Sequence, residues 1–173
     1  MINQNIVALL NDKINQEYFR SNLFLDISGW ANDLTLKGVQ GYFLNLSQKA
    51  LDNVNSGVEY LSECGYQAEL REIPEGLREF DNIEDLFVYI YEMEKGYRAD
   101  LNNILDVCLS NKDFATYANL ESQVETQHAE EFFLTSMLRK IGIVGSKGQG
   151  LYLIDKELSE KYPLPTDTTT DVA

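Results

Sequence analysis

Apolar residues recur at about 100° per residue along four long stretches of the chain, which is the period of an amphipathic α-helix. The stretches run from about residue 5 to 32, from 38 to 64, from 83 to 108 and from 111 to 141. The 173 residues include only three prolines, two of them among the last eleven residues, so little interrupts these periods. The pattern predicts an all-α protein with enough chain for the core of one four-helix bundle.

The links between these stretches predict how the helices run. Residues 33–37 and 110–112 are tight links, so each joins two antiparallel helices. Residues 65–82 are irregular and contain Pro74 and Gly76. Fully extended, they reach roughly 60 Å, which exceeds the roughly 40 Å length of such a helix. We therefore expect a long crossover between parallel second and third helices, and an up-down-down-up bundle.

Short polar motifs indicate where helices begin. Thr35 is a candidate N-cap of the second helix, and Asn82 with Asp85 is typical of a capping box before the third. Ser146-x-x-Gln149 predicts another capping box, which opens a short fifth helix. We expect residues 1–161 to form one domain and residues 162–173, rich in Thr and Pro, to form a flexible tail.

Each long helix carries unusual inward-facing residues near its own midpoint. These residues are Glu17, the pair Ala50 and Asn53, Glu94, and Gln127 with Glu130. Midpoints lie at one height in a bundle, so the polar groups should converge. Unpaired buried charge is costly, and bundles use converging carboxylates to hold cations such as iron. The pattern predicts a site of metal-binding ancestry. The alternative is that each Glu is an interior charge paired with Arg20 or Arg98.

Arg98 is a candidate for the cation that fills this site when no metal is bound. It lies one turn after Glu94, and its helical angle points it partly inward. Its guanidinium could form a bidentate ion pair with Glu94 and Glu130, or it could extend along the helix edge to solvent. Without a cation, we expect the pKa values of the converging carboxylates to rise.

Glu125-x-x-His128 has the spacing of a di-iron ligand motif, and His128 is the only histidine. The apolar period, however, puts Glu125 on the far side of the fourth helix and His128 on its flank. Treating the pair as inward-facing would turn Val124, Leu134 and Leu138 toward water. We therefore do not expect His128 to bind metal at the midpoint.

Charge and cysteine content limit the partners and the compartment. A net charge of −14 argues against nucleic acid or an anionic membrane as partner and suits the attraction of cations. The first residues lack the pattern of a signal peptide, and no apolar run reaches membrane length. Cys64 and Cys108 have no metal-type spacing, so we expect reduced packing residues. These features favour the cytoplasm.

From residue 6 to about 160, the chain resembles bacterial non-haem ferritins. The resemblance rests on the lengths of the five helices, on Glu17-Tyr18-Phe19 with Trp30, on Gln127-x-x-Glu130, and on Gly-Gln-Gly-Leu-Tyr-Leu-Ile-Asp-Lys-Glu-Leu at residues 148–158. It implies a hollow shell of twenty-four subunits that takes up iron as Fe2+ and stores it as Fe3+ mineral. The ligands that it implies are Glu17 for a first iron and Glu94, Gln127 and Glu130 for a second.

The sequence departs from this family on the second helix. The family's bridging Glu falls on Ala50, its His falls on Asn53, and Lys49 replaces a carboxylate of the third iron site that some relatives have. Thr126 and Ala129 replace two further carboxylates of that third site. The losses predict weak or atypical ferroxidase activity, with Asn53 at most a weak ligand. Haem is not expected, because the haem-binding relatives use a methionine within the second helix and residues 38–64 contain none.

Three functions remain open at this point. The first is iron storage by a homo-oligomeric shell with weak ferroxidase activity. The second is a non-enzymatic shell subunit or mobilisable iron store that assembles with an active ferritin. The third is a bundle that has lost iron and kept only its assembly.

Overall fold

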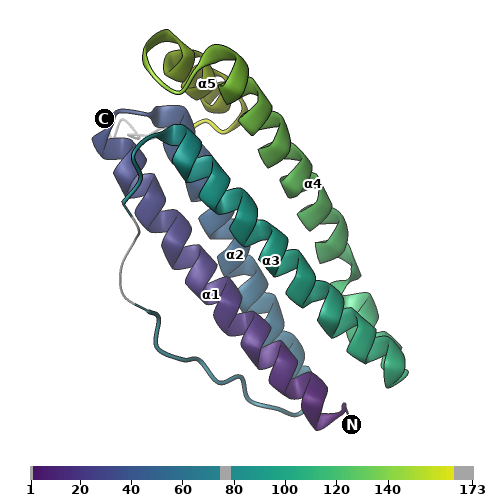
Figure 1. Ribbon diagram of the computed structural model, residues 1–173. Helices are drawn as coiled ribbons and strands as arrows, with labels where there is room; N and C mark the ends of the chain where they lie inside the picture. Colours follow the sequence, from purple (N-terminus) through teal and green to yellow (C-terminus); the bar gives the residue numbers. More distant parts are fainter. Residues whose placement is uncertain (1, 75–78, 166–173) are drawn as a thin grey trace, which may run out of the picture.

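The computed structural model describes residues 2–74 and 79–165, and within these ranges it is helical with no strand. Its helices are α1 (Gln4–Asp33), α2 (Lys37–Glu63), α3 (Ile83–Ser110), α4 (Phe114–Val144) and α5 (Gly148–Lys161). Helices α1 to α4 form one bundle, and α5 lies at one end of it (Figure 1). The prediction of an all-α four-helix bundle with a short fifth helix is confirmed. None of the described helices is long and apolar enough to cross a membrane.

The bundle has the predicted up-down-down-up topology, in which α1 and α4 run one way and α2 and α3 the other (Figure 1). The first part of the crossover between α2 and α3, up to residue 74, follows the outside of α1 (Figure 1). Two asparagines of α1 hold it there: Asn11 accepts from the backbone N–H of Glu69 at 2.8 Å, and Asn15 donates to the Glu69 carbonyl at 2.7 Å. Gly76 of the predicted crossover lies outside the described residues, and so do residues 166–173 of the predicted tail.

The helix starts agree only in part with the sequence motifs. Asn82 is the N-cap of α3, and its side chain accepts from the backbone N–H groups of Glu84 and Asp85. The prediction for Thr35 is wrong: Thr35 has a φ of 61°, and the N-cap of α2 is the next residue, Leu36. Leu36 is buried, so the tight turn is set by an apolar anchor and not by a side-chain cap.

The predicted capping box of the fifth helix is also wrong. Helix α5 begins at Gly148, its N-cap is Lys147, and no side chain caps it. Ser146 therefore lies one residue too early to act as the cap. The start of α5 is set instead by close packing, because a Cβ at Gly150 would lie 2.1 Å from the Val144 carbonyl oxygen.

Helix α5 packs closely on the first turns of α2. A Cβ at Gly38 would lie 1.9 Å from the carbonyl oxygen of Asp155, and a Cβ at Gly41 would lie 2.1 Å from that of Tyr162. The Asp155 carboxylate also accepts from the backbone N–H of Val39 at 2.9 Å, which satisfies a free donor at the start of α2. Only glycine at positions 38 and 41 allows this contact.

The apolar core consists of two clusters. One lies toward α5 and includes Phe24 and Phe87. The other lies toward the start of α1 and includes Leu61 and Leu101. Between them, at the middle of the four long helices, lies a layer of polar side chains. This layer contains the residues predicted to form the functional site.

Candidate functional site

Arg20 occupies the middle of the polar layer, between Glu17 of its own helix and Glu94 of α3. Its Nη1 donates to Glu17 Oε2 at 2.6 Å, and its Nη2 donates to both carboxylate oxygens of Glu94 at 2.8 Å. The guanidinium carbon lies 3.9 Å from the centre of the Tyr97 ring, within the range of a cation–π contact. One arginine thus joins two carboxylates that the sequence predicts as metal ligands.

Glu17 accepts further hydrogen bonds on its second carboxylate oxygen. Lys13 donates to it at 3.2 Å, Asn53 donates at 2.9 Å, and the Tyr97 hydroxyl donates to the same atom. Burial alone would raise the pKa of Glu17, but the charges of Arg20 and Lys13, with these hydrogen bonds, hold that pKa below its ordinary value. Glu17 is therefore a stable buried carboxylate at neutral pH.

Gln127 of α4 completes the contacts of Glu94. Its Nε2 donates to Glu94 Oε2 at 2.8 Å and to the backbone carbonyl of Glu94 at 3.0 Å. Glu94 has no exposed surface, and Gln127 is 4% exposed. The prediction that Glu17, Glu94 and Gln127 converge at one height agrees with the structure, but what they surround is a guanidinium.

Glu130 lies in the same layer but makes no direct ion pair with Arg20. It accepts a hydrogen bond from the Tyr42 hydroxyl, and Lys49 lies near enough for its charge to act on the carboxylate. Burial raises the pKa of Glu130 above its ordinary value, and the Tyr42 hydrogen bond and the Lys49 charge only partly offset this effect. Of the predicted carboxylates, Glu130 thus shows the expected rise in pKa, whereas Glu17 shows the opposite shift.

The structure places Arg98 outside this network. Its guanidinium pairs with Glu131 of α4 at 3.1 Å, and its side chain is 46% exposed. The space between Glu17 and Glu94 is already filled from α1, so the cation that fills the site is Arg20. Arg98 follows the edge of α3 toward solvent, which was the other conformation expected from the sequence.

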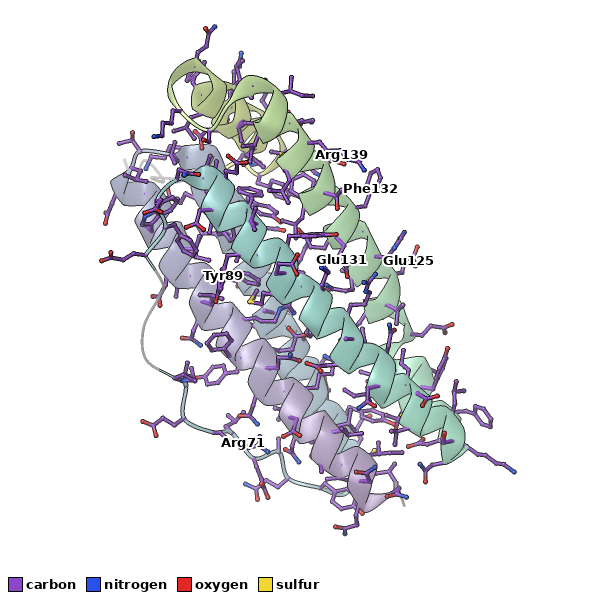
Figure 2. All side chains as sticks on the ribbon, viewed as in Figure 1. Arg71, Tyr89, Glu125, Glu131, Phe132 and Arg139 are labelled. Atoms are coloured by element: carbon purple, nitrogen blue, oxygen red, sulfur yellow. The ribbon has the colours of Figure 1, made fainter. Side chains whose placement is uncertain are left out.

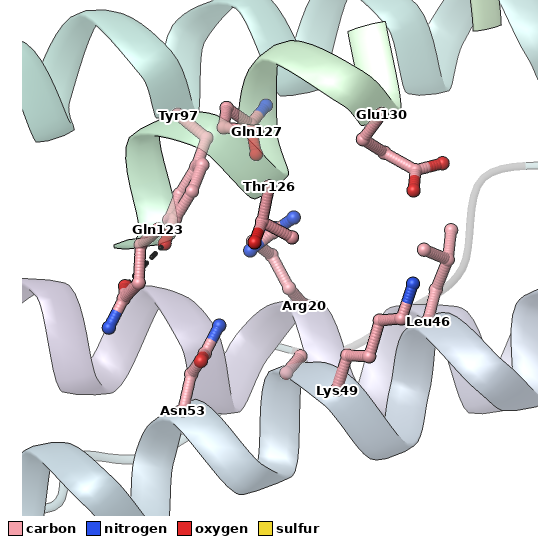
Figure 3. Close-up of a pocket in the computed structure, with 10 residues that line it drawn as sticks. Arg20, Leu46, Lys49, Asn53, Tyr97, Gln123, Thr126, Gln127 and Glu130 are labelled. Carbon is pink, nitrogen blue, oxygen red and sulfur yellow. Dashed lines mark hydrogen bonds between the residues drawn. The ribbon is translucent and has the colours of Figure 1, made fainter. Parts of the chain in front are cut away.

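A cavity of about 60 Å³ adjoins Arg20 where α2 faces α4. Ala50, Asn53 and Lys49 line it from α2, and Glu130 lines it from α4 (Figure 3). A water molecule requires about 10–15 Å³ of such space, so the cavity has room for a few waters. On the α2 side of the cavity, Ala50 supplies only a methyl group.

These residues do not fit a paired metal site. At Glu17 and Glu94, every carboxylate oxygen already accepts a hydrogen bond, and Asn53 offers Glu17 an N–H group where a metal site needs an imidazole nitrogen. Across residues 2–74 and 79–165, no three His, Cys, Asp or Glu side chains gather closely enough to hold a metal ion. The layer is charge-balanced by the protein's own cations.

Glu125 and His128 are both exposed on α4, as the apolar period predicts. Figure 2 shows Glu125 at the outer side of the helix, away from α1 and α2. This Glu-x-x-His pair therefore does not belong to the polar layer.

Several residues of the layer were not singled out from the sequence. Lys13 and Tyr97 contact Glu17, and Tyr42 contacts Glu130. The sequence did contain a signal for the contact between Lys13 and Glu17. Lys13 lies four residues before Glu17 and Arg20 lies three residues after it, so all three are on the same side of a helix. Nothing in the sequence pattern pairs Tyr42 with Glu130, because that contact depends on how α2 and α4 pack.

A bundle of this topology, with carboxylates at its midpoint and a short helix at one end, defines the ferritin-like class. The family model for the ferritin-like domain matches residues 7–144. The chain belongs to the ferritin family, and the resemblance found in the sequence is confirmed.

Curated relatives and solved structures agree with this assignment. The chain is 31% identical over 156 residues to the bacterial non-heme ferritin of Campylobacter jejuni, covering 90% of this chain and 93% of the relative. It is 31% identical to a probable bacterial non-heme ferritin-like protein of Haemophilus influenzae, covering 91% and 96%. An open-pore ferritin from Archaeoglobus fulgidus superposes with a TM-score of 0.87 at 28% identity, covering 92% of this chain and 98% of the other.

Proposed function

We propose that the protein is a subunit of a ferritin shell that stores iron and that its bundle midpoint oxidises ferrous iron only slowly. Iron is the cargo of this shell. Slow oxidation is inferred from the position of Arg20, which donates hydrogen bonds to both Glu17 and Glu94. A ferrous ion would have to displace a buried guanidinium to reach either carboxylate.

The donor set of α2 supports slow oxidation independently of Arg20. A paired ferrous site needs a bridging carboxylate between its two ions and strong donors on each of them. Here the bridging position is Ala50, and Asn53 donates its N–H group to Glu17. One donor is therefore absent, and the amide at the second position directs its N–H group to Glu17.

Large exposed apolar side chains on α4 and α5 support assembly. Phe132 is 69% exposed, Ile143 is 83% exposed and Tyr152 is 65% exposed. Figure 2 shows Phe132 on the outer side of α4. A closed shell of twenty-four copies, as the family resemblance implies, would cover such side chains. In this proposal residues 1–161 form the assembling domain.

Two further features fit this function. The net charge of −14 suits the attraction of cations toward a mineral. Cys64 and Cys108 are both free thiols, which fits a reducing compartment such as the cytoplasm, where we place the shell.

A second candidate function is favoured by the closed ion-pair layer. If the midpoint oxidises no iron at all, the chain would act as a structural subunit that assembles with an active ferritin and extends its storage volume. The two candidates differ in whether shells of this chain alone load iron faster than iron oxidises in protein-free buffer.

The test uses the purified full chain. Sedimentation velocity measures its assembly, and we expect a shell at micromolar concentration. Ferrous iron is then added under nitrogen and oxygen is admitted, while stopped-flow absorbance follows the ferric product. We expect an initial rate close to that of buffer, followed by iron that stays with the shell on gel filtration. A monomer or dimer that retains no iron would refute storage. Retention only in mixed shells with an active ferritin would favour the second candidate.

A further inference from the structure

We propose that Arg20, supported by Lys13, is the residue that excludes divalent metal from the bundle midpoint, and that its removal creates a site for a single divalent cation. The inference deepens the proposed function, because it names the residue that controls the same layer. The space that Arg20 vacates is bordered by carboxylate oxygens of Glu17 and Glu94. Such oxygen donors suit hard or intermediate divalent ions.

The charges in the layer already balance without metal. Glu17 and Glu94 have no exposed side-chain surface, whereas Arg20 is 8% and Lys13 is 7% exposed. Two buried carboxylates thus face two buried cations, and their net charge is zero. Adding a divalent ion to this set would leave two buried charges uncompensated, which a protein interior strongly disfavours. Metal can enter only if the guanidinium leaves.

Hydrogen bonds also occupy the carboxylate oxygens of Glu17 and Glu94, although Arg20 Nε has no hydrogen-bond partner. Arg20 takes Glu17 Oε2 and both oxygens of Glu94, while Lys13, Asn53 and Tyr97 share Glu17 Oε1. All four carboxylate oxygens therefore have a donor. The contact with Glu94 uses both of its oxygens, so a metal ion that binds Glu94 has to compete with a charge-assisted hydrogen bond.

Packing holds Arg20 in this position. Its guanidinium lies over the Tyr97 ring, and Phe24 flanks it at 5.5 Å on the side of the larger apolar cluster. The guanidinium is thus positioned between an aromatic face and two carboxylates by contacts within the protein alone. Its pKa is raised, because the charges of Glu17 and Glu94 outweigh the effect of burial, so it stays charged at every physiological pH.

Cobalt(II) is the probe, because its visible absorption reports inner-sphere ligands and because it needs no oxidation step. Cobalt(II) is titrated into three proteins: the wild-type shell, Arg20→Ala, and the double variant Arg20→Ala with Glu94→Gln. Isothermal calorimetry and visible absorption measure the binding in each titration. Thermal melting is recorded with and without the metal. The double variant keeps every surface carboxylate, so it corrects for metal bound elsewhere on this acidic shell.

We expect Arg20→Ala to gain one cobalt(II) per subunit relative to both the wild type and the double variant. Without metal, Arg20→Ala should melt about 5 °C or more below the wild type, because one buried carboxylate loses its cation. Cobalt(II) should recover part of that loss, and the double variant should regain stability without metal. Arg20→Lys keeps the positive charge, so it should exclude cobalt(II) although it melts lower than the wild type.

Two outcomes would overturn the inference. One is a cobalt(II) site in the wild type that Glu94→Gln abolishes, which would mean that Arg20 does not exclude metal. The other is an Arg20→Lys protein that binds cobalt(II) in the layer, which would show that the positive charge at position 20 does not exclude the metal. The Arg20→Lys variant decides the question even if Arg20→Ala fails to fold. Iron retention by the wild-type shell is measured separately, so failure of storage and failure of this inference are distinguishable.

Discussion

The Nη2 group of Arg20 donates to both carboxylate oxygens of Glu94 at 2.8 Å, and this contact links α1 to α3 through the middle of the bundle. It lies where the two apolar clusters of the core meet. The residue that neutralises Glu94 thus also joins two neighbouring helices of the bundle. Stability and metal exclusion therefore depend on the same contact.

Glu94→Gln should destabilise the protein. The change keeps the shape of the side chain but leaves Arg20 with one carboxylate partner, and breaking one side of a buried pair typically costs about 3–5 kcal/mol. Thermal or urea unfolding monitored by circular dichroism measures the loss. Glu92→Gln is the matched control on the same helix: its pair with Lys95 is exposed, so its effect should stay below about 1 kcal/mol.

The contribution of Glu17 should depend on pH with a defined sign. Its pKa is lowered in the folded protein, so ionised Glu17 stabilises the fold above the ordinary pKa of a glutamate, about 4.3. That contribution is lost as the pH falls through the lower folded-state value. The stability difference between wild type and Glu17→Gln should therefore be largest near pH 7 and shrink below about pH 4.

Glu130 acts in the opposite direction, because its raised pKa makes the fold lose stability as the pH rises through that value. The comparison of wild type with Glu17→Gln cancels this effect, since both proteins retain Glu130. Melting temperatures measured across pH 3 to 8 give the profile. A difference that stays constant over this range would show that Glu17 carries no depressed pKa.

Restoring the missing donors on α2 should not restore oxidation by itself. Ala50→Glu with Asn53→His supplies a bridge and an imidazole, but Arg20 still occupies Glu17 and Glu94. Adding Arg20→Ser should raise the initial rate of ferrous oxidation by about tenfold or more, because changes to residues that hydrogen-bond to metal ligands commonly alter metal affinity or activity by about 10–100-fold. Stopped-flow absorbance compares the two variants. A double variant as fast as the triple would show that Arg20 is no obstacle.

Gly38→Ala should detach α5. The new methyl group would lie 1.9 Å from the Asp155 carbonyl oxygen, so α5 has to move, and overpacking of this kind costs about 1–3 kcal/mol. Sedimentation velocity should show weakened or lost assembly, because a helix as short as α5 is not stable without its packing surface. Gly96→Ala is the control, because nothing lies within 4 Å of its added methyl group.

The sequence predicts the helices and the height of the polar layer, because both follow from the apolar period. Glu17, Glu94 and Gln127 meet because each lies at the midpoint of its own helix. The prediction of Arg98 as the candidate for the central cation is wrong, because the helical period does not fix where a long flexible side chain ends. Arg20 takes the site because it lies three residues after Glu17 and reaches Glu94 on α3.

Features set by packing between helices could not be predicted in this way. The contact of Tyr42 with Glu130 depends on the relative rotation of α2 and α4. The start of α5 depends on the backbone contact at Gly150, which overrides the capping motif at Ser146. The local motif did predict the start of α3, where the Asn82 side chain accepts from the backbone N–H groups of Glu84 and Asp85.

Anomalous diffraction at the iron absorption edge tests the central claim most directly. Crystals of the wild-type shell are soaked in ferrous iron under air, and an anomalous difference map is calculated. We predict iron within the shell but no peak within bonding distance of Glu17 or Glu94, with Arg20 still between them. An iron peak that bridges these two carboxylates, with the Arg20 side chain displaced, would contradict the account.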